Sequence, residues 1–156
     1  MRRVAPSYKG LSAASRTASR IASAGSAKRD TRPEVLLRRA LWRTGLRYRV
    51  DVGSLPGRPD VAIPAARLAI FCDGDFWHGR DLRHRLKKLA VGHNAHYWVS
   101  KIKSNVDRDR RVDKLLHGLG WEALRLWESD VLADPEHAAR AVLRAVRSGR
   151  HRRDSP

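Results

Sequence analysis

Three acidic side chains stand where a metal-dependent phosphodiesterase site is commonly built. Glu34 lies in the first turn of an expected helix, Asp60 opens an expected strand, and Asp73 ends the next one. Metal-assisted hydrolysis of a phosphodiester needs carboxylates and carbonyls that bind a hard divalent ion beside the scissile phosphate. A β-hairpin would bring Asp60 next to the end of the neighbouring strand, and a nearby helix would present Glu34. Each acid also has a structural interpretation, because Glu34 suits a helix cap and a Pro-Asp pair suits a turn.

The segment after Asp73 lacks the periodic pattern that is typical of a buried helix or strand. Phe76 and Trp77 stand among glycines and charged residues, outside any periodic element. On a DNA-binding surface, such aromatic side chains wedge between base steps or stack on an unpaired base. The alternative is a loop that two rings anchor to the core. His78 suits general acid or base catalysis near neutral pH, although a lone histidine is more often a surface or hydrogen-bonded group.

Charge points to a polyanionic partner. The 156 residues include 33 Lys and Arg against 16 Asp and Glu, a formal net charge of +17. Nucleic acid is the usual partner of such a chain, and an anionic membrane surface is the weaker alternative. The single cysteine, Cys72, excludes a disulfide framework and a zinc site with two cysteine ligands, and it fits the cytoplasm. No stretch approaches the roughly 20 apolar residues of a membrane span.

Composition divides the chain into three segments. Residues 1–29 carry seven positive charges and no acid, which predicts a flexible basic arm that orders on DNA. The same composition resembles an organellar transit peptide, a minor alternative because the whole chain is rich in Arg and Ala. Residues 30–148 form one folded domain, and residues 149–156 are expected to be a basic disordered tail.

The apolar pattern predicts a small α/β domain with a central mixed sheet. The run 68–72 is continuously apolar and predicts a strand buried on both faces. Thr31-Arg32-Pro33-Glu34 has the spacing of a capping box. Residues 73–95 are expected to be irregular. The expected helices are 34–44, 96–119 and 135–146, and the expected strands are 48–52, 60–63, 68–72 and 121–127.

The expected long helix carries a polar face that suits phosphate contacts. Asp107 and Asp109 are the acids among its bases. A solvated charged face is the simpler interpretation. The more specific interpretation is a face that contacts phosphates and includes one buried, functional aspartate.

Several motifs taken together resemble the very-short-patch-repair (Vsr) DNA mismatch endonucleases, over about residues 17–147. They are Thr31-Arg32-Pro33-Glu34, 54–60 (Ser-Leu-Pro-Gly-Arg-Pro-Asp), 71–78 (Phe-Cys-Asp-Gly-Asp-Phe-Trp-His), Tyr97-Trp98, Lys101-Ile102, 105–111, Gly120-Trp121 and 126–128. The resemblance implies a restriction-endonuclease-like three-layer α/β fold, with a central mixed sheet flanked by helices. It also implies Mg²⁺-dependent nicking on the 5′ side of the thymine in a T·G mismatch, which arises by deamination of 5-methylcytosine.

The resemblance also assigns roles to individual residues. Asp60 matches the principal metal ligand, and Cys72 matches a position whose backbone carbonyl ligates metal. His78 matches the catalytic histidine, Glu34 a helix glutamate near the site, and Asp109 a supporting aspartate. The rings that match DNA-wedging aromatics are Phe76, Trp77 and Trp98. The further expected DNA contacts are Arg20, Arg58, Lys101, Asn105 and Arg108.

The chain departs from the family pattern at three places. Asp73 stands where the best-known form has a second histidine, so it adds metal affinity or repels Asp60 and Asp109 unless a cation lies between them. Asp75 stands at a cysteine position of the family's structural zinc site, and Gly79-Arg80 follow where its ligands should continue. We therefore predict no structural zinc. The loop 80–95 differs from the family pattern, so the family's recognition sequence is not assigned to this chain.

Three functions are weighed. The first is Mg²⁺-dependent mismatch nicking by a monomer that binds duplex DNA with a T·G mismatch and no membrane, and that works alongside a cytosine-5 DNA methyltransferase and repair proteins. The second is a related nicking endonuclease with another mismatch or structure specificity. The third is a non-enzymatic basic module whose affinity comes mainly from counterion release. The motifs favour the first function, because the acids and His78 have no purpose in the third.

Overall fold

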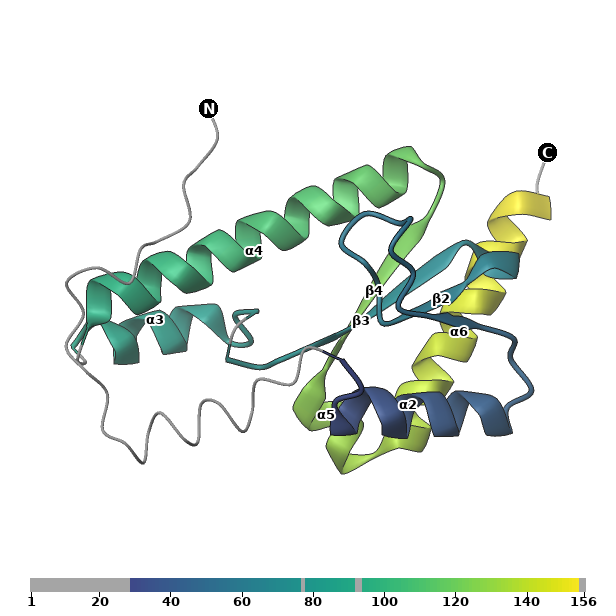
Figure 1. Ribbon diagram of the computed structural model, residues 1–156, viewed down its shortest axis with the longest axis horizontal. Helices are drawn as coiled ribbons and strands as arrows, with labels where there is room; N and C mark the ends of the chain where they lie inside the picture. Colours follow the sequence, from purple (N-terminus) through teal and green to yellow (C-terminus); the bar gives the residue numbers. More distant parts are fainter. Residues whose placement is uncertain (1–28, 77, 92–93, 155–156) are drawn as a thin grey trace.

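A four-stranded mixed sheet forms the centre of the computed structural model, which describes residues 29–76, 78–91 and 94–154 (Figure 1). The strand order is β1-β2-β3-β4. β1 and β2 pair antiparallel, as do β2 and β3, whereas β3 and β4 run parallel. The strands are β1 (Arg49–Val50), β2 (Val61–Ile63), β3 (Leu68–Asp73) and β4 (Glu122–Trp127).

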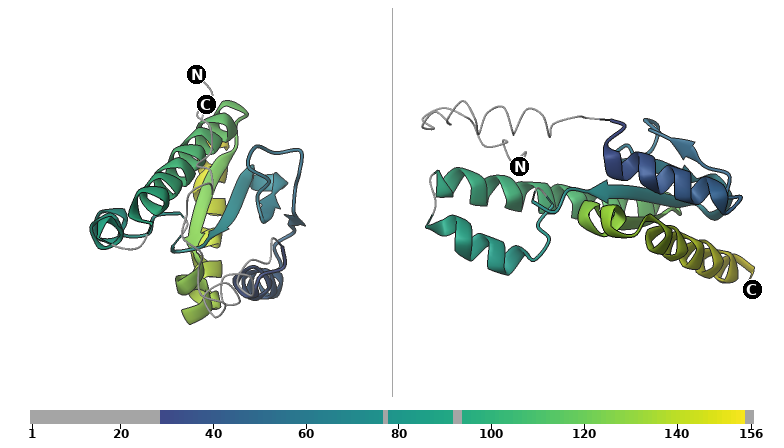
Figure 2. Two further views of the ribbon diagram at one scale, coloured as in Figure 1. Left: turned by 60° about the vertical axis from the view of Figure 1, so that its left-hand side comes forward. Right: turned by 90° about the horizontal axis from the view of Figure 1, so that it is seen from below.

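Helices cover both faces of the sheet, which confirms the predicted three-layer α/β architecture. α4 (Ala95–Gly118) and α2 (Arg32–Arg43) lie on opposite sides of it (Figure 2). The α2 side also carries α5 (Glu128–Ala133) and α6 (Pro135–Asp154), and a large apolar core lies there. A smaller apolar cluster lies on the α4 side. The predicted burial of β3 on both faces is confirmed, since its residues are buried except Cys72, which is half-buried.

The alternation of β3 divides its side chains between these two layers. Leu68, Ile70 and Cys72 belong to the core on the α2 side, whereas Ala69 and Phe71 belong to the cluster on the α4 side. Consecutive residues of a strand point to opposite faces. The last two residues of β3, Cys72 and Asp73, therefore face different layers of the molecule.

Two sequence-based predictions about local structure are wrong. Residues 73–95 are not irregular throughout, because α3 (Leu82–Ala90) forms there and lies alongside α4 (Figures 1 and 2). Its apolar residues Leu82, Leu86 and Leu89 recur at helical spacing, but the bases between them hide the pattern. The helix predicted to end at residue 146 continues to Asp154, so the backbone of the expected tail is helical up to that residue.

Differences at the amino-terminal side of the domain are smaller. Thr31 makes no side-chain cap to the backbone of α2 and instead donates its Oγ1 hydrogen bond to Glu34 Oε1, at 2.7 Å. β1 is shorter than the predicted strand 48–52. The expected arm 1–29 lies outside the described residues except for Arg29, and so does a short helix that its sequence allows near 17–24. The described helices include none that is long and apolar enough to cross a membrane.

Candidate active site

The β2–β3 hairpin places Asp60 beside the end of β3, as the sequence predicts. The backbone N–H of Cys72 donates a hydrogen bond to Asp60 Oδ2, at 2.7 Å. Cys72 lies beyond Ile70, the residue of β3 that pairs with Val61 at the start of β2. In an extended strand the N–H and C=O of one residue face the same edge. The carbonyl of Cys72 is therefore expected on the side where Asp60 lies.

Asp60 and Glu34 line a common groove of about 590 Å³ between α2 and the hairpin. The pKa of Asp60 is raised to about 6. Burial is the largest cause, and the negative charges of Glu34 and Asp73 also raise the pKa, whereas the Cys72 N–H and His78 act to lower it. This groove accordingly contains oxygen donors whose mutual repulsion a hard cation would relieve. The basic residues of the groove are Arg29, Arg38 and Arg58.

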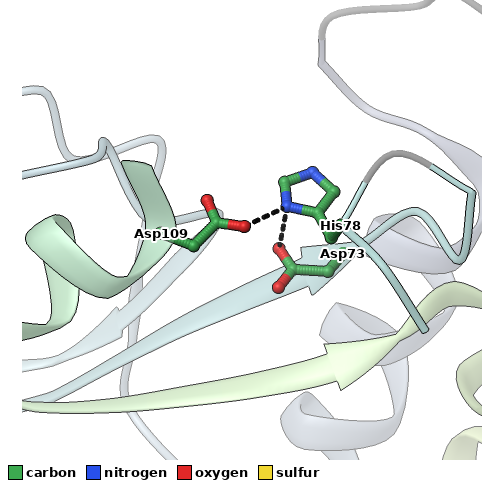
Figure 3. Close-up of side chains that lie close together, drawn as sticks. All are labelled: Asp73, His78 and Asp109. Carbon is green, nitrogen blue, oxygen red and sulfur yellow. Dashed lines mark hydrogen bonds and ion pairs between the residues drawn. The ribbon is translucent and has the colours of Figure 1, made fainter. Parts of the chain in front are cut away.

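A second cluster lies at the same end of β3, on the α4 side. His78 Nδ1 is 2.7 Å from Asp109 Oδ2 and 3.5 Å from Asp73 Oδ1 (Figure 3). Asp73 comes from β3, His78 from the loop after it, and Asp109 from α4. The other ring nitrogen, Nε2, points away from both carboxylates (Figure 3). One ligand atom from each residue lies within 4.8 Å of the others, which is the spacing of a possible metal site.

The charge of Asp109 decides the tautomer of His78. Burial acts to raise the pKa of Asp109, but the hydrogen bond from His78 and the positive charges of His78 and Arg125 outweigh it and lower the pKa. An ionised carboxylate only accepts hydrogen bonds, so Nδ1 must be the donor. When the ring is neutral, Nε2 therefore carries the lone pair. This arrangement suits a base that takes a proton at Nε2.

Arg125 is a residue of this cluster that the sequence analysis missed. Its Nη1 is 3.0 Å from Asp73 Oδ2, its Nη2 is 2.8 Å from Asp113 Oδ1, and its guanidinium lies over the Phe71 ring at 4.4 Å. Nη2 also donates to the backbone carbonyl of Asp109, at 3.4 Å. Arg125 therefore stands between Asp73 and Asp109, two of the carboxylates that the sequence analysis expected to repel each other unless a cation intervened.

A signal for Arg125 was present in the sequence. It interrupts the apolar run of β4 and pairs in register with Phe71 of the central strand. A charged side chain in such a position requires a partner, because burying an unpaired charge is costly. The partners are Asp113 and the more buried Asp73. Burial raises the pKa of Asp73, although His78 and Arg125 act to lower it.

The aromatic residues expected to contact DNA gather where the loop after β3 meets the start of α4. Phe76 and Trp98 pack edge to face with ring centroids 6.0 Å apart, and Trp98 packs likewise against Tyr97 at 5.0 Å. Arg85 of α3 lies over the Phe76 ring at 5.3 Å. Both Phe76 and Trp98 are half-buried, so packing between the loop and α4 accounts for part of their surface. Trp77 and Arg20 lie outside the described residues.

The expected polar DNA contacts are divided between two places. Arg58 is exposed beside the Asp60 groove and forms an ion pair with Asp51. Arg108, on α4, is exposed and lines a pocket of about 270 Å³ together with Asp73, His78, Asp109 and Arg125. Lys101 and Asn105 lie on α4 about two turns and one turn before Arg108, respectively, and both are half-buried.

Known proteins resemble this chain over most of its length. The family model "DNA mismatch endonuclease Vsr" matches residues 14–84. The Type II nicking enzyme V.HpaIIP of Haemophilus parainfluenzae is 40% identical over 79% of this chain and 86% of that protein. The Type II nicking enzyme V.NmeDIP of Neisseria meningitidis serogroup C is 40% identical over 76% of this chain and 79% of that protein. The DNA mismatch endonuclease Vsr of Escherichia coli K12 is 42% identical over 65% of this chain and 64% of that protein.

The fold, the site and these similarities define the class of the protein, which is a DNA endonuclease with an α/β core. More narrowly, the chain belongs to the Vsr family of DNA mismatch endonucleases. The restriction-endonuclease-like fold expected from the motifs follows from this membership and agrees with the mixed sheet. The non-enzymatic alternative is thereby rejected. The roles of the individual site residues stay predictions.

Proposed function

We propose that the chain is a Mg²⁺-dependent endonuclease that nicks DNA on the 5′ side of the thymine in a T·G mismatch. The main support is the end of β3, where an oxygen-rich groove with Asp60 adjoins a histidine whose Nδ1 is bound to Asp109. Family membership supports DNA as the substrate. The T·G target rests on the resemblance to the family as a whole.

The oxygen donors of the groove fit a hard divalent cation. Asp60 and the backbone carbonyl of Cys72 would hold it, and Glu34, with Thr31 bound to one oxygen, would lie close by. Mg²⁺ prefers such oxygen ligands and tolerates few protein ligands. When bound, the ion supplies Lewis-acid polarisation of a phosphoryl oxygen and stabilises charge on the leaving 3′ oxygen.

The cluster on the α4 side would handle the proton. Water attacks phosphorus and its proton passes to His78 Nε2, while the bond to the 3′ oxygen breaks and that oxygen takes a proton from solvent. Asp109 keeps Nδ1 protonated and directs Nε2 away from the carboxylates. Asp73 is expected to act here through its ion pair with Arg125, and not as a metal ligand, because the guanidinium contacts both of its oxygens.

DNA would approach both clusters across a basic surface. Arg58 beside the groove would contact phosphates, as would Lys101, Asn105 and Arg108 on α4. Phe76 and Trp98 would contact the bases beside the mismatch, and so would Trp77, which follows Phe76 in the chain. We further propose that the protein acts as a monomer in the bacterial cytoplasm and works alongside a cytosine-5 DNA methyltransferase and repair proteins.

A strand-specific cleavage assay tests this function. A labelled duplex with one T·G mismatch and its fully paired control are incubated with Mg²⁺ and with EDTA. We expect a Mg²⁺-dependent nick in the thymine strand of the mismatched duplex alone. Equal cutting of both duplexes would support the second function, a nicking enzyme with another specificity.

Two variants assign the activity to the site. Asp60→Ala should abolish nicking while binding to DNA persists. Glu136→Ala is the matched control, since this acid forms an ion pair with Arg43 in the last turn of α2, whereas Glu34 of the groove lies in the first turn. If Asp60→Ala nicks at the wild-type rate, the metal site has been assigned wrongly.

A further inference from the structure

The loop of residues 74–81 has little backbone structure of its own, although it carries His78. Within it, the N–H of His78 donates to the carbonyl of Gly74 at 3.1 Å, and the N–H of Arg80 donates to the carbonyl of Asp75 at 3.2 Å. Such turns shape the loop but do not attach it to the rest of the domain. The placement of His78 against Asp109 of α4 therefore depends on side chains that tie the loop to neighbouring elements.

One such attachment is the close approach of Gly79 to α4. Gly79 has a φ of +75°, and a Cβ at this residue would lie 2.9 Å from Val106 Cγ2 and 3.1 Å from Leu82 Cδ1. Both the positive φ and the lack of space favour glycine. The residue directly after His78 is thus pressed against the helix that carries Asp109.

Besides the packing of Phe76 against Trp98 of α4, a further attachment is made by the guanidinium of Arg80. Its Nη1 donates to Ser129 Oγ at 2.7 Å and lies 2.8 Å from Asp130 Oδ1, both on α5. The guanidinium also lies over the ring of Trp127, the last residue of β4, at 5.7 Å from its centroid. Arg80 therefore connects the loop to the junction between β4 and α5.

Arg80 also compensates an acid of its own loop. Asp75 Oδ1 is buried and has no hydrogen-bond partner among the residues that the structure describes, and Arg80 Nη1 is 3.6 Å from it. Asp75 and Arg80 are among the residues that stand where the family resemblance would place ligands of a structural zinc, a site that we predict to be absent here. They contact each other, so this region contains an ionic attachment that requires no metal.

We propose that Arg80 is a positioning residue, which fixes the loop on the β4–α5 junction and thereby sets the orientation of His78 toward Asp109. The inference rests on the proposed role of His78. Exposed ion pairs contribute little to global stability, and the side chains of Arg80 and Asp130 are 36% and 56% exposed. Removing Arg80 should therefore change the position of His78 much more than the stability of the fold.

Single-turnover nicking of the T·G duplex measures the catalytic effect separately from DNA affinity. Arg80→Ala should lower the rate constant about 100-fold, since a displacement of about 1 Å in a catalytic group typically has that effect. Arg80→Lys keeps the charge but not the planar fork, and should recover only part of the rate. Arg140→Ala is the matched control, because it removes an exposed arginine that pairs with Asp134 on the α6 side.

A double-mutant cycle tests whether Arg80 acts through α5. Removing both of its α5 partners, by Ser129→Ala with Asp130→Ala, should lower the rate to a similar extent. The two losses should not add when combined with Arg80→Ala, because each change breaks the same attachment. Additive losses would overturn the proposal.

The imidazole resonances of His78 give a readout that does not depend on activity. In the metal-free protein, assigned with a His78→Gln variant, Arg80→Ala should shift or broaden the Nδ1–H signal, whereas Arg140→Ala should leave it unchanged. If the wild type fails to nick any duplex, the proposed function fails and the spectrum alone still tests the attachment. If the wild type nicks and Arg80→Ala matches it in rate and in spectrum, the proposal is wrong.

Discussion

Replacing Asp60 by asparagine should stabilise the metal-free protein while abolishing nicking. Burial raises the pKa of Asp60 from 3.8 to about 6. The folded state therefore holds this proton more tightly than the unfolded state. Consequently, the free energy of unfolding falls as the pH rises through the interval between these two values, and the full loss is present above it.

The expected size follows from the shift. About two pKa units correspond to about 3 kcal/mol, since one unit is 1.36 kcal/mol. Asparagine still accepts a hydrogen bond from the Cys72 N–H, but the loss of charge weakens that bond by about 1 kcal/mol. The net gain is about 2 kcal/mol, which corresponds to a rise of about 4–8 °C in Tm for a chain of this size.

Thermal unfolding in EDTA at pH 7.5 and at pH 4 measures this effect. Asp60→Asn should exceed the wild type at pH 7.5, and the gain should vanish at pH 4. Adding Mg²⁺ at pH 7.5 should raise the Tm of the wild type only, because a ligand that binds the folded state stabilises it. Asp51→Asn is a control that should lower the Tm at pH 7.5, since the hydrogen bond from Arg58 lowers the pKa of Asp51 and thus favours its charged form in the folded state. A Tm for Asp60→Asn at or below the wild-type value at pH 7.5 would refute the reasoning.

Three further predictions concern the α4 side of the site. Arg125→Gln should lower the free energy of unfolding by about 3 kcal/mol, because it leaves Asp73 buried without its cation. Urea unfolding measures this loss. If Asp73→Asn, added to the same chain, fails to restore part of the loss, the pairing is contradicted. His78→Gln should slow single-turnover nicking by 10²–10⁴-fold, as expected for loss of a general base, with little change in the Kd for DNA; a variant of undiminished rate would exclude His78 as the base. Arg108→Ala should weaken DNA binding alike for mismatched and paired duplexes and reduce the slope of log K against log salt by about 1, whereas a loss confined to the mismatched duplex would make Arg108 a specificity residue.

The sequence was sufficient for the parts of the site that depend on neighbours along the chain. The Asp60–Cys72 contact follows from a hairpin between two apolar strands, and His78 stands five residues after Asp73. The contacts of Arg80 and Arg125 were not predictable in this way. Arg80 meets Ser129 across 49 residues, and Arg125 meets Asp73 across 52. Only the packing of β4 and α5 against the end of β3 determines which acid each arginine meets.

The departure at Asp73 is understandable once Arg125 is known. A neutral histidine at this position would add no charge, whereas an aspartate adds one negative charge to a cluster that already contains Asp109. The guanidinium of Arg125 supplies the balancing positive charge and contacts both Asp73 oxygens, at 3.0 and 3.2 Å. Asp73 and Arg125 thus form a pair with no net charge, while the Asp73 carboxylate lies 3.5 Å from His78.

The end of β3 explains why the proposed metal site and the proposed proton acceptor would stand side by side. Cys72 belongs to the core on the α2 side, where Glu34 and Asp60 line their groove. Asp73, one residue later, faces the α4 side because side chains alternate along a strand, and there it meets His78 and Asp109. A phosphodiester at this strand end would contact oxygen donors from one layer and an imidazole from the other. The alternation of a single buried strand therefore separates the two chemical tasks by one residue.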